Sequence, residues 1–386
     1  MLLFGENILW PQFYIFSLIV LIFACLMMRS GNLLLLNGKQ KTQGKVIPVS
    51  VIYLRLFFFI LFIMSAFRGI EITNDTWSYL RTYRTIKAYG LMGEERMEQA
   101  YVWLNLILAK LFPQGDMGFY VLLFLVSAIS YYAMEQWLEE NSATYGESIF
   151  LFYFMMNSSF MCVVRQTLAF SIVLLGLKRA KNKELFRFLI YVVIACMFHK
   201  TAIIGILLYA FMHTKFSSKK AAIIIGIAGG IVLTQNAIAR ILEILGITTS
   251  YVTSGDGLNV VALVLPVFYL ALIALDVIKK KSMNRDDSQK GFFKYCIIFS
   301  VATFILILRM PVFNRISSYF TYLAVPYVSN VISEIEDKKS ILIIRIILFA
   351  AVWGYATITL TYRPEWQHLW PYKFFWNSMY QLVTDL

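Results

Sequence analysis

The chain has 386 residues, of which 59% are hydrophobic and only 15% are charged, and its formal net charge is +13. A soluble domain carries about 25% charged residues, so this composition excludes a water-soluble globular fold. The mean hydropathy of +0.68 and recurrent apolar runs of about 20 residues predict an all-α polytopic membrane protein, because each run can cross a ~30 Å hydrocarbon core.

In chain order, twelve spanning helices are predicted, at 8–28, 46–67, 117–137, 147–161, 163–179, 185–198, 200–213, 220–236, 258–278, 292–309, 312–332 and 340–361. The segment 94–112 also has a helical pattern. Its apolar part covers only about 13 residues, which is short for a full span. We therefore interpret it as a re-entrant or interfacial helix.

The basic loops predict the orientation of these helices. Cytoplasmic loops carry an excess of Lys and Arg. When 94–112 is not counted as a span, the basic loops all fall on one side of the membrane, at 29–45, 178–187, 215–220, 279–290 and 334–339. Both termini are then outside. One predicted cytoplasmic loop, 135–147, carries no Lys or Arg. The positive charge thus reflects membrane topology, and no nucleic-acid partner is expected.

The whole chain, 1–386, is predicted to be a single integral membrane domain. Its outer side is expected to carry a loop, 68–100, with short helices, and an aromatic C-terminal segment, 362–386, lying flat on the surface because Trp and Tyr favour the membrane boundary. An anchor without chemistry explains that segment equally well. The four cysteines lie in apolar runs without CxxC spacing, which is typical of buried side chains and not of a metal site.

Ionisable residues gather at four turns that this topology places on the outer face. Such residues near membrane depth are rare and costly, which makes them candidates for function. They lie in FRGIEITNDTWSYLRTY (67–83), CVVRQTLAF (162–170), MFHKTAII (197–204) and ILRMPVFNRISSYF (307–320).

Two arginines of this set stand at predicted helix starts. Arg165 falls in the first turn of its helix, and Arg315 follows Pro311, where a new helix is expected. A cation at a helix N-terminus is unfavourable by about 0.3–1 kcal/mol, so an anion is expected to complete each site. Guanidinium binds phosphate through two parallel hydrogen bonds. The outer turns favour Arg while the cytoplasmic loops are mostly Lys, which indicates an anion site on the outer face.

Plainer interpretations of these residues remain open. A single arginine near a helix end often extends its charge to the lipid headgroups. His199 is also explained by a hydrogen bond between helices. Asp75 is explained as the N-cap of a short helix that ends near Gly90, and Arg81 and Arg84 as its solvated face.

Three blocks of the sequence resemble the EpsG family of bacterial exopolysaccharide proteins, which belongs with the Wzy-type polysaccharide polymerases. They are FRGIEITNDTWSYLRTY (67–83), VVRQTLAFSIVLLGLKRAKNKELFRFLIYVVIACMFHKTAIIGILLYAF (163–211) and RMPVFNRISSYF (309–320). The family pattern is matched at Arg68, Asp75, Tyr79, Arg165, Gln166, Ala169, Phe198, His199, Thr201 and Ala202. Asn74 stands where the family pattern has glycine before the aspartate.

This resemblance implies a polymerase in the bacterial cytoplasmic membrane, with its active site facing outside. It would join oligosaccharide repeat units linked to undecaprenyl diphosphate, working beside membrane lipid, a flippase and a chain-length regulator, with no cofactor and no metal. The transition state has oxocarbenium character. The implied diphosphate ligands are Arg165, Gln166, Arg309, Arg315 and Arg68, the proton acceptor is His199 or Asp75, and the sugar-stacking residues are Trp77, Tyr79 and Tyr83.

Three other functions are weighed against the polymerase. A flippase for lipid-linked oligosaccharides would carry cations at midplane depth, whereas here they lie at the outer ends of the helices. Another polyprenyl-phosphate-dependent glycosyltransferase or ligase would have a large outer loop, which is absent. A partner of a synthase complex without an active site would not need the clustered arginines and His199.

Overall fold

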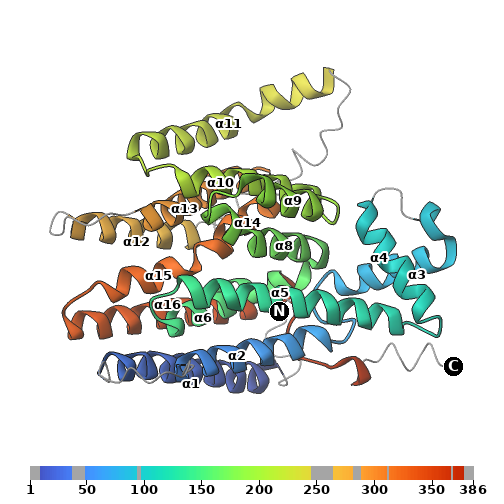
Figure 1. Cartoon of the computed structure of the whole chain (residues 1–386), viewed down its shortest axis with the longest axis horizontal. Coiled ribbons are helices and arrows are strands. Elements are labelled where there is room, and N and C mark those ends of the chain that lie inside the picture. The colour runs from blue at the N-terminus through green and yellow to red at the C-terminus, as the bar shows by residue number, and fades with distance from the viewer. Residues whose placement is uncertain are drawn as a thin grey trace. The chain divides into compact units, whose positions relative to one another are not determined.

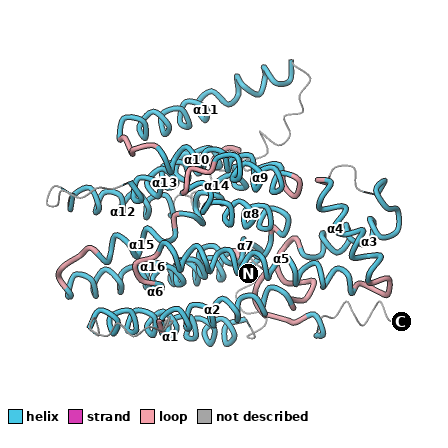
Figure 2. The backbone as a smooth tube through the Cα atoms, in the orientation of Figure 1, coloured by secondary structure: helices cyan, strands magenta, loops and turns pink. Residues whose placement is uncertain are grey.

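The computed structural model describes residues 9–36, 48–93, 97–244, 264–280, 288–310, 313–366 and 368–377. Within these ranges the chain is helical and contains no strand (Figures 1 and 2), which confirms the predicted all-α class. The chain divides into two compact units. The first unit is formed by described residues of Met1–Leu175, Val193–Ala202 and Ile332–Leu386, and the second by those of Gly176–Val192 and Ile203–Val331.

In the first unit, α2 packs against both α1 and α5, and α1 also packs against α6. A π-helical turn at Tyr153–Asn157 joins α6 to α7. The helices of this unit are α1 (Leu9–Leu36), α2 (Val49–Ala66), α3 (Thr76–Tyr89), α4 (Gln99–Leu111), α5 (Met117–Asn141), α6 (Tyr145–Phe152), α7 (Ser158–Cys162), the first part of α8 (Val164–Lys181) and α16 (Lys338–Tyr362).

In the second unit, α13 packs against α10, α11, α12 and α14. Helix α9 (Leu185–Cys196) begins in this unit and ends in the first. The remaining helices are α10 (Gly205–His213), α11 (Ser218–Ile244), α12 (Val264–Lys280), α13 (Ser288–Ile307), α14 (Asn314–Leu323) and α15 (Val325–Ser333).

Five of the described helical segments are long and apolar enough to cross a membrane, and a bent pair makes a sixth. The five are Pro11–Ser30, Val49–Ala66, Met117–Asn141, Lys290–Ile307 and Lys338–Tyr362. This coarse pattern supports an integral membrane protein. The count of twelve spans and the orientation of the termini stay predictions.

Three of the predicted spans differ in shape from the expectation. Segments 147–161 and 163–179 form the bent pair, in which Tyr145–Cys162 and Val164–Lys181 meet at 116°. Segment 312–332 is broken into α14 and α15, and Pro326 lies in the first turn of α15. Proline lacks a backbone N–H and is tolerated only where a helix begins, so it separates the two helices.

Helix α4, within the predicted interfacial segment 94–112, contains 13 residues. At 1.5 Å per residue it is about 20 Å long, shorter than the ~30 Å hydrocarbon core. Its length therefore agrees with a helix that does not cross the membrane.

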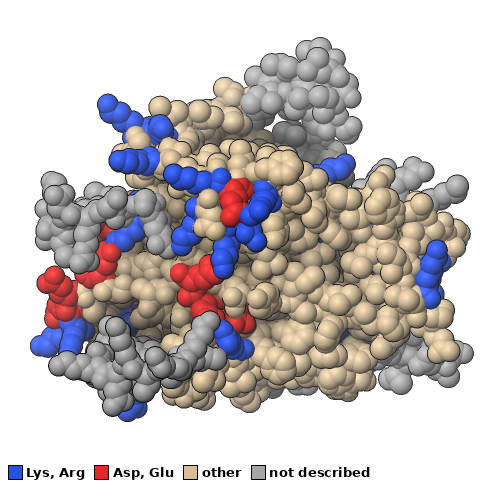
Figure 3. Space-filling model, viewed as in Figure 1, with Lys and Arg blue, Asp and Glu red and all other residues tan. Residues whose placement is uncertain are grey.

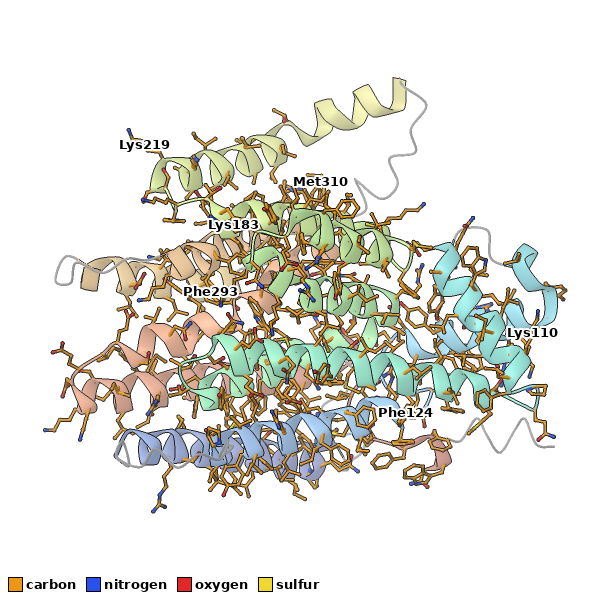
Figure 4. All side chains as sticks on the ribbon, viewed as in Figure 1. Lys110, Phe124, Lys183, Lys219, Phe293 and Met310 are labelled. Carbon is orange, nitrogen blue, oxygen red and sulfur yellow. The ribbon has the colours of Figure 1, made fainter. Side chains whose placement is uncertain are left out.

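Aromatic side chains fill the interior of the first unit. Phe57 and Phe58 of α2 are buried, and the Phe58 ring stacks on Phe152 with centroids 5.8 Å apart. At the surface of the unit, Phe124 of α5, which is 40% exposed and labelled in Figure 4, has its ring centroid 5.2 Å from that of Phe62 on α2. These rings are large and rigid, so they bury much apolar area at little cost in side-chain entropy.

The helix surfaces are also apolar. Wide areas of the face in Figure 3 carry no Lys, Arg, Asp or Glu side chain. Exposed apolar residues include Ile15 on α1, Phe59 on α2 and Ile347 on α16. A water-soluble protein rarely exposes such broad apolar areas, and lipid is the solvent that stabilises them.

A buried ion pair fastens α16 to α6. Glu147 in the first turn of α6 is fully buried, and its Oε1 lies 2.7 Å from Arg345 Nε. Thr144 donates a further hydrogen bond to Oε2 of the same carboxylate. A carboxylate that is removed from water needs such partners to stay charged.

We expect Arg345→Ala to destabilise the protein by about 3 kcal/mol, because it leaves the Glu147 carboxylate buried without its cation. Thermal unfolding of the detergent-solubilised chain measures this loss. The control is Arg55→Ala, since Arg55 is 46% exposed and pairs with Glu135 and Glu139 near solvent, where such pairs contribute about 1 kcal/mol or less. Equal losses in both variants would contradict the assigned role of the Glu147–Arg345 pair.

Candidate active site

The candidate site is built on the loop that follows α2. Arg68 in this loop is buried, and its Nη1 donates hydrogen bonds to Ser65 O (2.8 Å) and Ser65 Oγ (3.0 Å). Its Nε donates to Thr76 Oγ1 at 3.0 Å. Since Thr76 is the first residue of α3, the guanidinium fixes the start of α3 to the end of α2.

Arg68 also lines a small polar cavity of about 10 Å³ with Ser127, Ser130, Tyr131 and Thr167. Its Nη2 and the Ser130 hydroxyl are buried and make no hydrogen bond within the protein. The volume suffices for about one water molecule. Arg68 therefore faces the interior of the first unit, and its implied role as a diphosphate ligand is not carried into the proposal below.

We call the described residues after α16, 363–366 and 368–377, the C-terminal strap. This strap pairs with the loop that holds Arg68. Three backbone hydrogen bonds of 2.9 Å join them, from Gly69 N–H to Lys373 O, from Thr73 N–H to His368 O and from Phe375 N–H to Phe67 O. The Tyr372 hydroxyl also donates to the carbonyl of Met64 at the end of α2. The aromatic segment is thus attached to the candidate site by specific bonds as well as by its affinity for an interface.

A sharp bend places Arg165 at a helix start. Helix α7 ends at Cys162 and α8 begins at Val164, so Arg165 lies in the first turn of α8, as predicted. The Arg165 side chain is 17% exposed, while the neighbouring Gln166 is buried. Because of this burial, Gln166 is not carried forward as a diphosphate ligand.

The anion beside Arg165 belongs to the protein itself. Arg165 Nη1 forms an ion pair with Glu98 Oε2, and the Glu98 side chain is 11% exposed. Glu98 Oε1 accepts a hydrogen bond from the backbone N–H of Lys200 at 3.2 Å. Glu98 precedes α4, so a single carboxylate connects α8, the approach to α4 and the turn that follows His199.

Two tyrosines complete the surroundings of Arg165. Its guanidinium lies 5.6 Å from the centre of the Tyr101 ring, where a cation is attracted to the aromatic face. Tyr79 of α3 is hydrogen-bonded to Arg165. Burial raises the pKa of Tyr79, while Arg165 opposes this rise and Asp75 adds to it. The Arg165 Nε is buried without a hydrogen-bond partner, so the bonds within the protein do not use every donor of the guanidinium.

His199 lies in the turn that Glu98 contacts. Its ring is 7% exposed, and the Thr201 N–H donates to His199 Nδ1 at 3.3 Å. The Thr201 hydroxyl lies 2.7 Å from the same nitrogen. Since Nδ1 accepts from the Thr201 N–H, the neutral ring carries its proton on Nε2 and presents a donor there.

Asp75 lies at the N-cap of α3, but its side chain makes no capping hydrogen bond. The carboxylate is half-buried and close enough to Cys162 and Tyr79 to influence the titration of both groups. Its interpretation as a simple cap is therefore not supported by the bonding. Helix α3 ends at Gly90 with a φ of 65°, a conformation that glycine adopts at low cost.

The implied sugar-stacking residues differ in exposure. Trp77 is 42% exposed, and the Arg84 guanidinium lies 5.9 Å from its ring centre. Tyr79 and Tyr83 are buried in the apolar cluster formed by α3, α4, α5 and α8. Only Trp77 is therefore carried forward as a stacking surface.

Arg309 and Arg315 belong to the second unit. Both are exposed; Arg309 follows the end of α13, and Arg315 is the second residue of α14. The predicted helix start near Arg315 is thus confirmed, while Pro311 lies outside the described residues. Their implied part in binding diphosphate stays a prediction.

Glu98 is the site residue that the sequence did not reveal. It lies in the acidic stretch EERMEQ (94–99), where nothing in composition or spacing separates it from Glu94 and Glu95. Only the packing of the loop against α8 and the turn after His199 distinguishes Glu98. Among the described residues, no group of three or more His, Cys, Asp or Glu side chains is placed to hold a metal ion.

We expect a chain that ends at Tyr362 to free the loop after α2, because the strap supplies the acceptors for the Gly69 and Thr73 amides. Hydrogen–deuterium exchange of peptides covering 67–74 should accelerate at least about tenfold, as happens when a protected amide opens locally. Peptides from the middle of α5 provide the internal reference. Unchanged exchange at 67–74 would show that the strap does not hold the loop.

Arg68→Lys is expected to destabilise the protein by about 1.5–3 kcal/mol, since a single ammonium cannot bond both Ser65 and Thr76. Thermal unfolding in detergent measures the loss. Arg81→Lys is the matched control, because Arg81 is exposed on α3 and its change should stay within about 0.5 kcal/mol. A neutral Arg68→Lys variant would refute the connecting role of Arg68.

Comparison with known proteins gives one family match. The model of the EpsG family matches residues 51–374, a range that includes every candidate site residue discussed above. No curated protein matches, and no solved structure matches.

Proposed function

The chain belongs to the EpsG family, and from this membership and the site around Arg165 we propose that it polymerises lipid-linked oligosaccharides by glycosyl transfer. The family is associated with glycosyltransferase-like polymerases. The donor would be a glycan chain on a polyprenyl diphosphate, of the undecaprenyl type. The acceptor would be a sugar hydroxyl of a second lipid-linked repeat unit.

Arg165 is the observation that carries this proposal. It lies in the first turn of α8, its side chain is 17% exposed, and its buried Nε makes no hydrogen bond. A guanidinium next to the positive end of a helix is a strong receptor for phosphate oxygens. A diphosphate at this position would be bound through its charge, and the charge that develops as it leaves would be stabilised.

The neighbouring groups suit the rest of the reaction. His199 lies in the turn whose Lys200 N–H bonds to Glu98, and its imidazole would contact the diphosphate or the acceptor sugar. Asp75 has a half-buried carboxylate that makes no capping bond, and it can bind a sugar hydroxyl. Trp77 offers an exposed ring on the same helix start, and aromatic rings of this kind stack on sugar faces.

The proposal keeps several finer predictions from the sequence. The site would face the outside of a bacterial cytoplasmic membrane, with about twelve spans and both termini outside. Arg309 and Arg315 would bind the diphosphate of the donor. The reaction would need neither metal nor cofactor, and a flippase and a chain-length regulator would act in the same pathway.

We expect Arg165→Ala to reduce polymer at least about 100-fold, the usual loss when a group that stabilises developing negative charge is removed. The measurement is the size distribution of the surface glycan in cells that carry only the variant. Single repeat units should remain on the outer face, because the supply of substrate is intact. Arg165→Lys should recover little, since an ammonium cannot form the paired hydrogen bonds.

Arg55→Ala is the control, because it removes an arginine from an arginine–glutamate contact on α2 and α5 away from the site. It should leave polymer length unchanged. Long polymer in the Arg165→Ala variant would disprove the donor-site assignment. Loss of even the single repeat unit from the outer face would favour a lipid-linked oligosaccharide flippase.

A further inference from the structure

We infer that Glu98 is an exchangeable internal anion that occupies Arg165 until substrate diphosphate replaces it, and that the released carboxylate then takes the proton of the acceptor hydroxyl. This inference rests on the proposed function. It adds a catalytic residue that lies in no sequence block carrying the family resemblance, and it gives the site an order of events.

The contacts identify Glu98 as the resting partner of Arg165. One carboxylate oxygen pairs with Arg165 Nη1, and the other accepts from the Lys200 N–H at 3.2 Å. Both side chains are partly exposed, at 17% for Arg165 and 11% for Glu98. Each member of this pair keeps some exposed surface, whereas in the Glu147–Arg345 pair the carboxylate keeps none.

Charge decides which anion Arg165 holds. A diphosphate ester carries more negative charge than one carboxylate and offers several oxygens to the guanidinium fork. The two anions would repel each other in the same small space. Exchange is therefore favoured once the diphosphate arrives, and before that the pair avoids leaving a partly buried guanidinium uncompensated.

The same exchange changes the chemistry of the carboxylate. A neighbouring cation weakens a carboxylate as a base, and a neighbouring anion strengthens it. When the diphosphate replaces Glu98 on Arg165, Glu98 loses the first influence and gains the second. Glu98 is thus released for proton transfer only when the donor is bound, so the proton acceptor becomes available at the moment when it is needed.

Glycosyl transfer then forms one bond, breaks one bond and moves one proton. The acceptor hydroxyl oxygen bonds to the anomeric carbon of the donor sugar, and the hydroxyl proton passes to a Glu98 carboxylate oxygen. The bond from that carbon to the diphosphate oxygen breaks, and its electron pair stays on the diphosphate held by Arg165. His199, whose Nδ1 already accepts from the Thr201 N–H, is a neighbour of the base and not the base itself.

Binding of farnesyl diphosphate to the full chain in detergent micelles tests the exchange. Glu98→Gln should bind this probe at least about tenfold more tightly than the unchanged protein, because a charge-assisted bond that competes for Arg165 is lost. The same variant should lose polymer synthesis. Glu139→Gln is the matched control, since it also removes a carboxylate from an arginine contact, and it should change neither property.

The outcomes separate the two proposals. Equal or weaker binding by Glu98→Gln, together with weaker binding by Arg165→Ala, would show that Glu98 only anchors the loop, and the inference would fail alone. Unchanged binding by Arg165→Ala would overturn the diphosphate site itself. Tighter binding with full polymer synthesis in Glu98→Gln would refute the role of Glu98 as the base.

Glu98→Asp keeps the charge but shortens the reach to Arg165, and it provides a second variant if Glu98→Gln does not fold. Its probe affinity should also rise above that of the unchanged protein. An affinity at or below that of the unchanged protein would contradict the exchange.

Discussion

A charge that is removed from water must be compensated, and this requirement shapes the polar interior of the protein. In the first unit, Glu147 is compensated by Arg345. In the second unit, Asp276 is compensated by Lys294 and by the Tyr327 hydroxyl. These charges lie on helices whose other faces are apolar, so their pairing determines which helix faces meet.

At the candidate site the charges are also compensated, but a bound substrate can change which groups pair. Arg165 and Glu98 compensate each other, yet both are within reach of solvent. Around them, Arg68 and the C-terminal strap fix the loop after α2 through hydrogen bonds to neutral groups. A charged substrate can replace Glu98 on Arg165 if this ion pair can exchange while the residues around it stay in place.

The sequence predicted the features that depend on local pattern. Apolar runs gave the all-α class, Arg165 was assigned to the first turn of its helix, and Gly90 to the end of α3, because each follows from residues close in the chain. Glu98 and the C-terminal strap could not be predicted, since their partners are distant in sequence: Arg165 lies 67 residues from Glu98. The burial of Arg68 was missed because the residues that surround it, such as Ser127 and Thr167, are distant in sequence, although its bonding partners Ser65 and Thr76 are close.

The most direct test is a structure of the full chain in a lipid nanodisc with a bound prenyl diphosphate. We expect phosphate oxygens within about 2.7–2.9 Å of the Arg165 guanidinium nitrogens, and a Glu98 carboxylate that has left Arg165 and faces the anomeric carbon of the donor or the position of the acceptor hydroxyl. An intact Arg165–Glu98 pair, with the diphosphate bound elsewhere, would contradict the account.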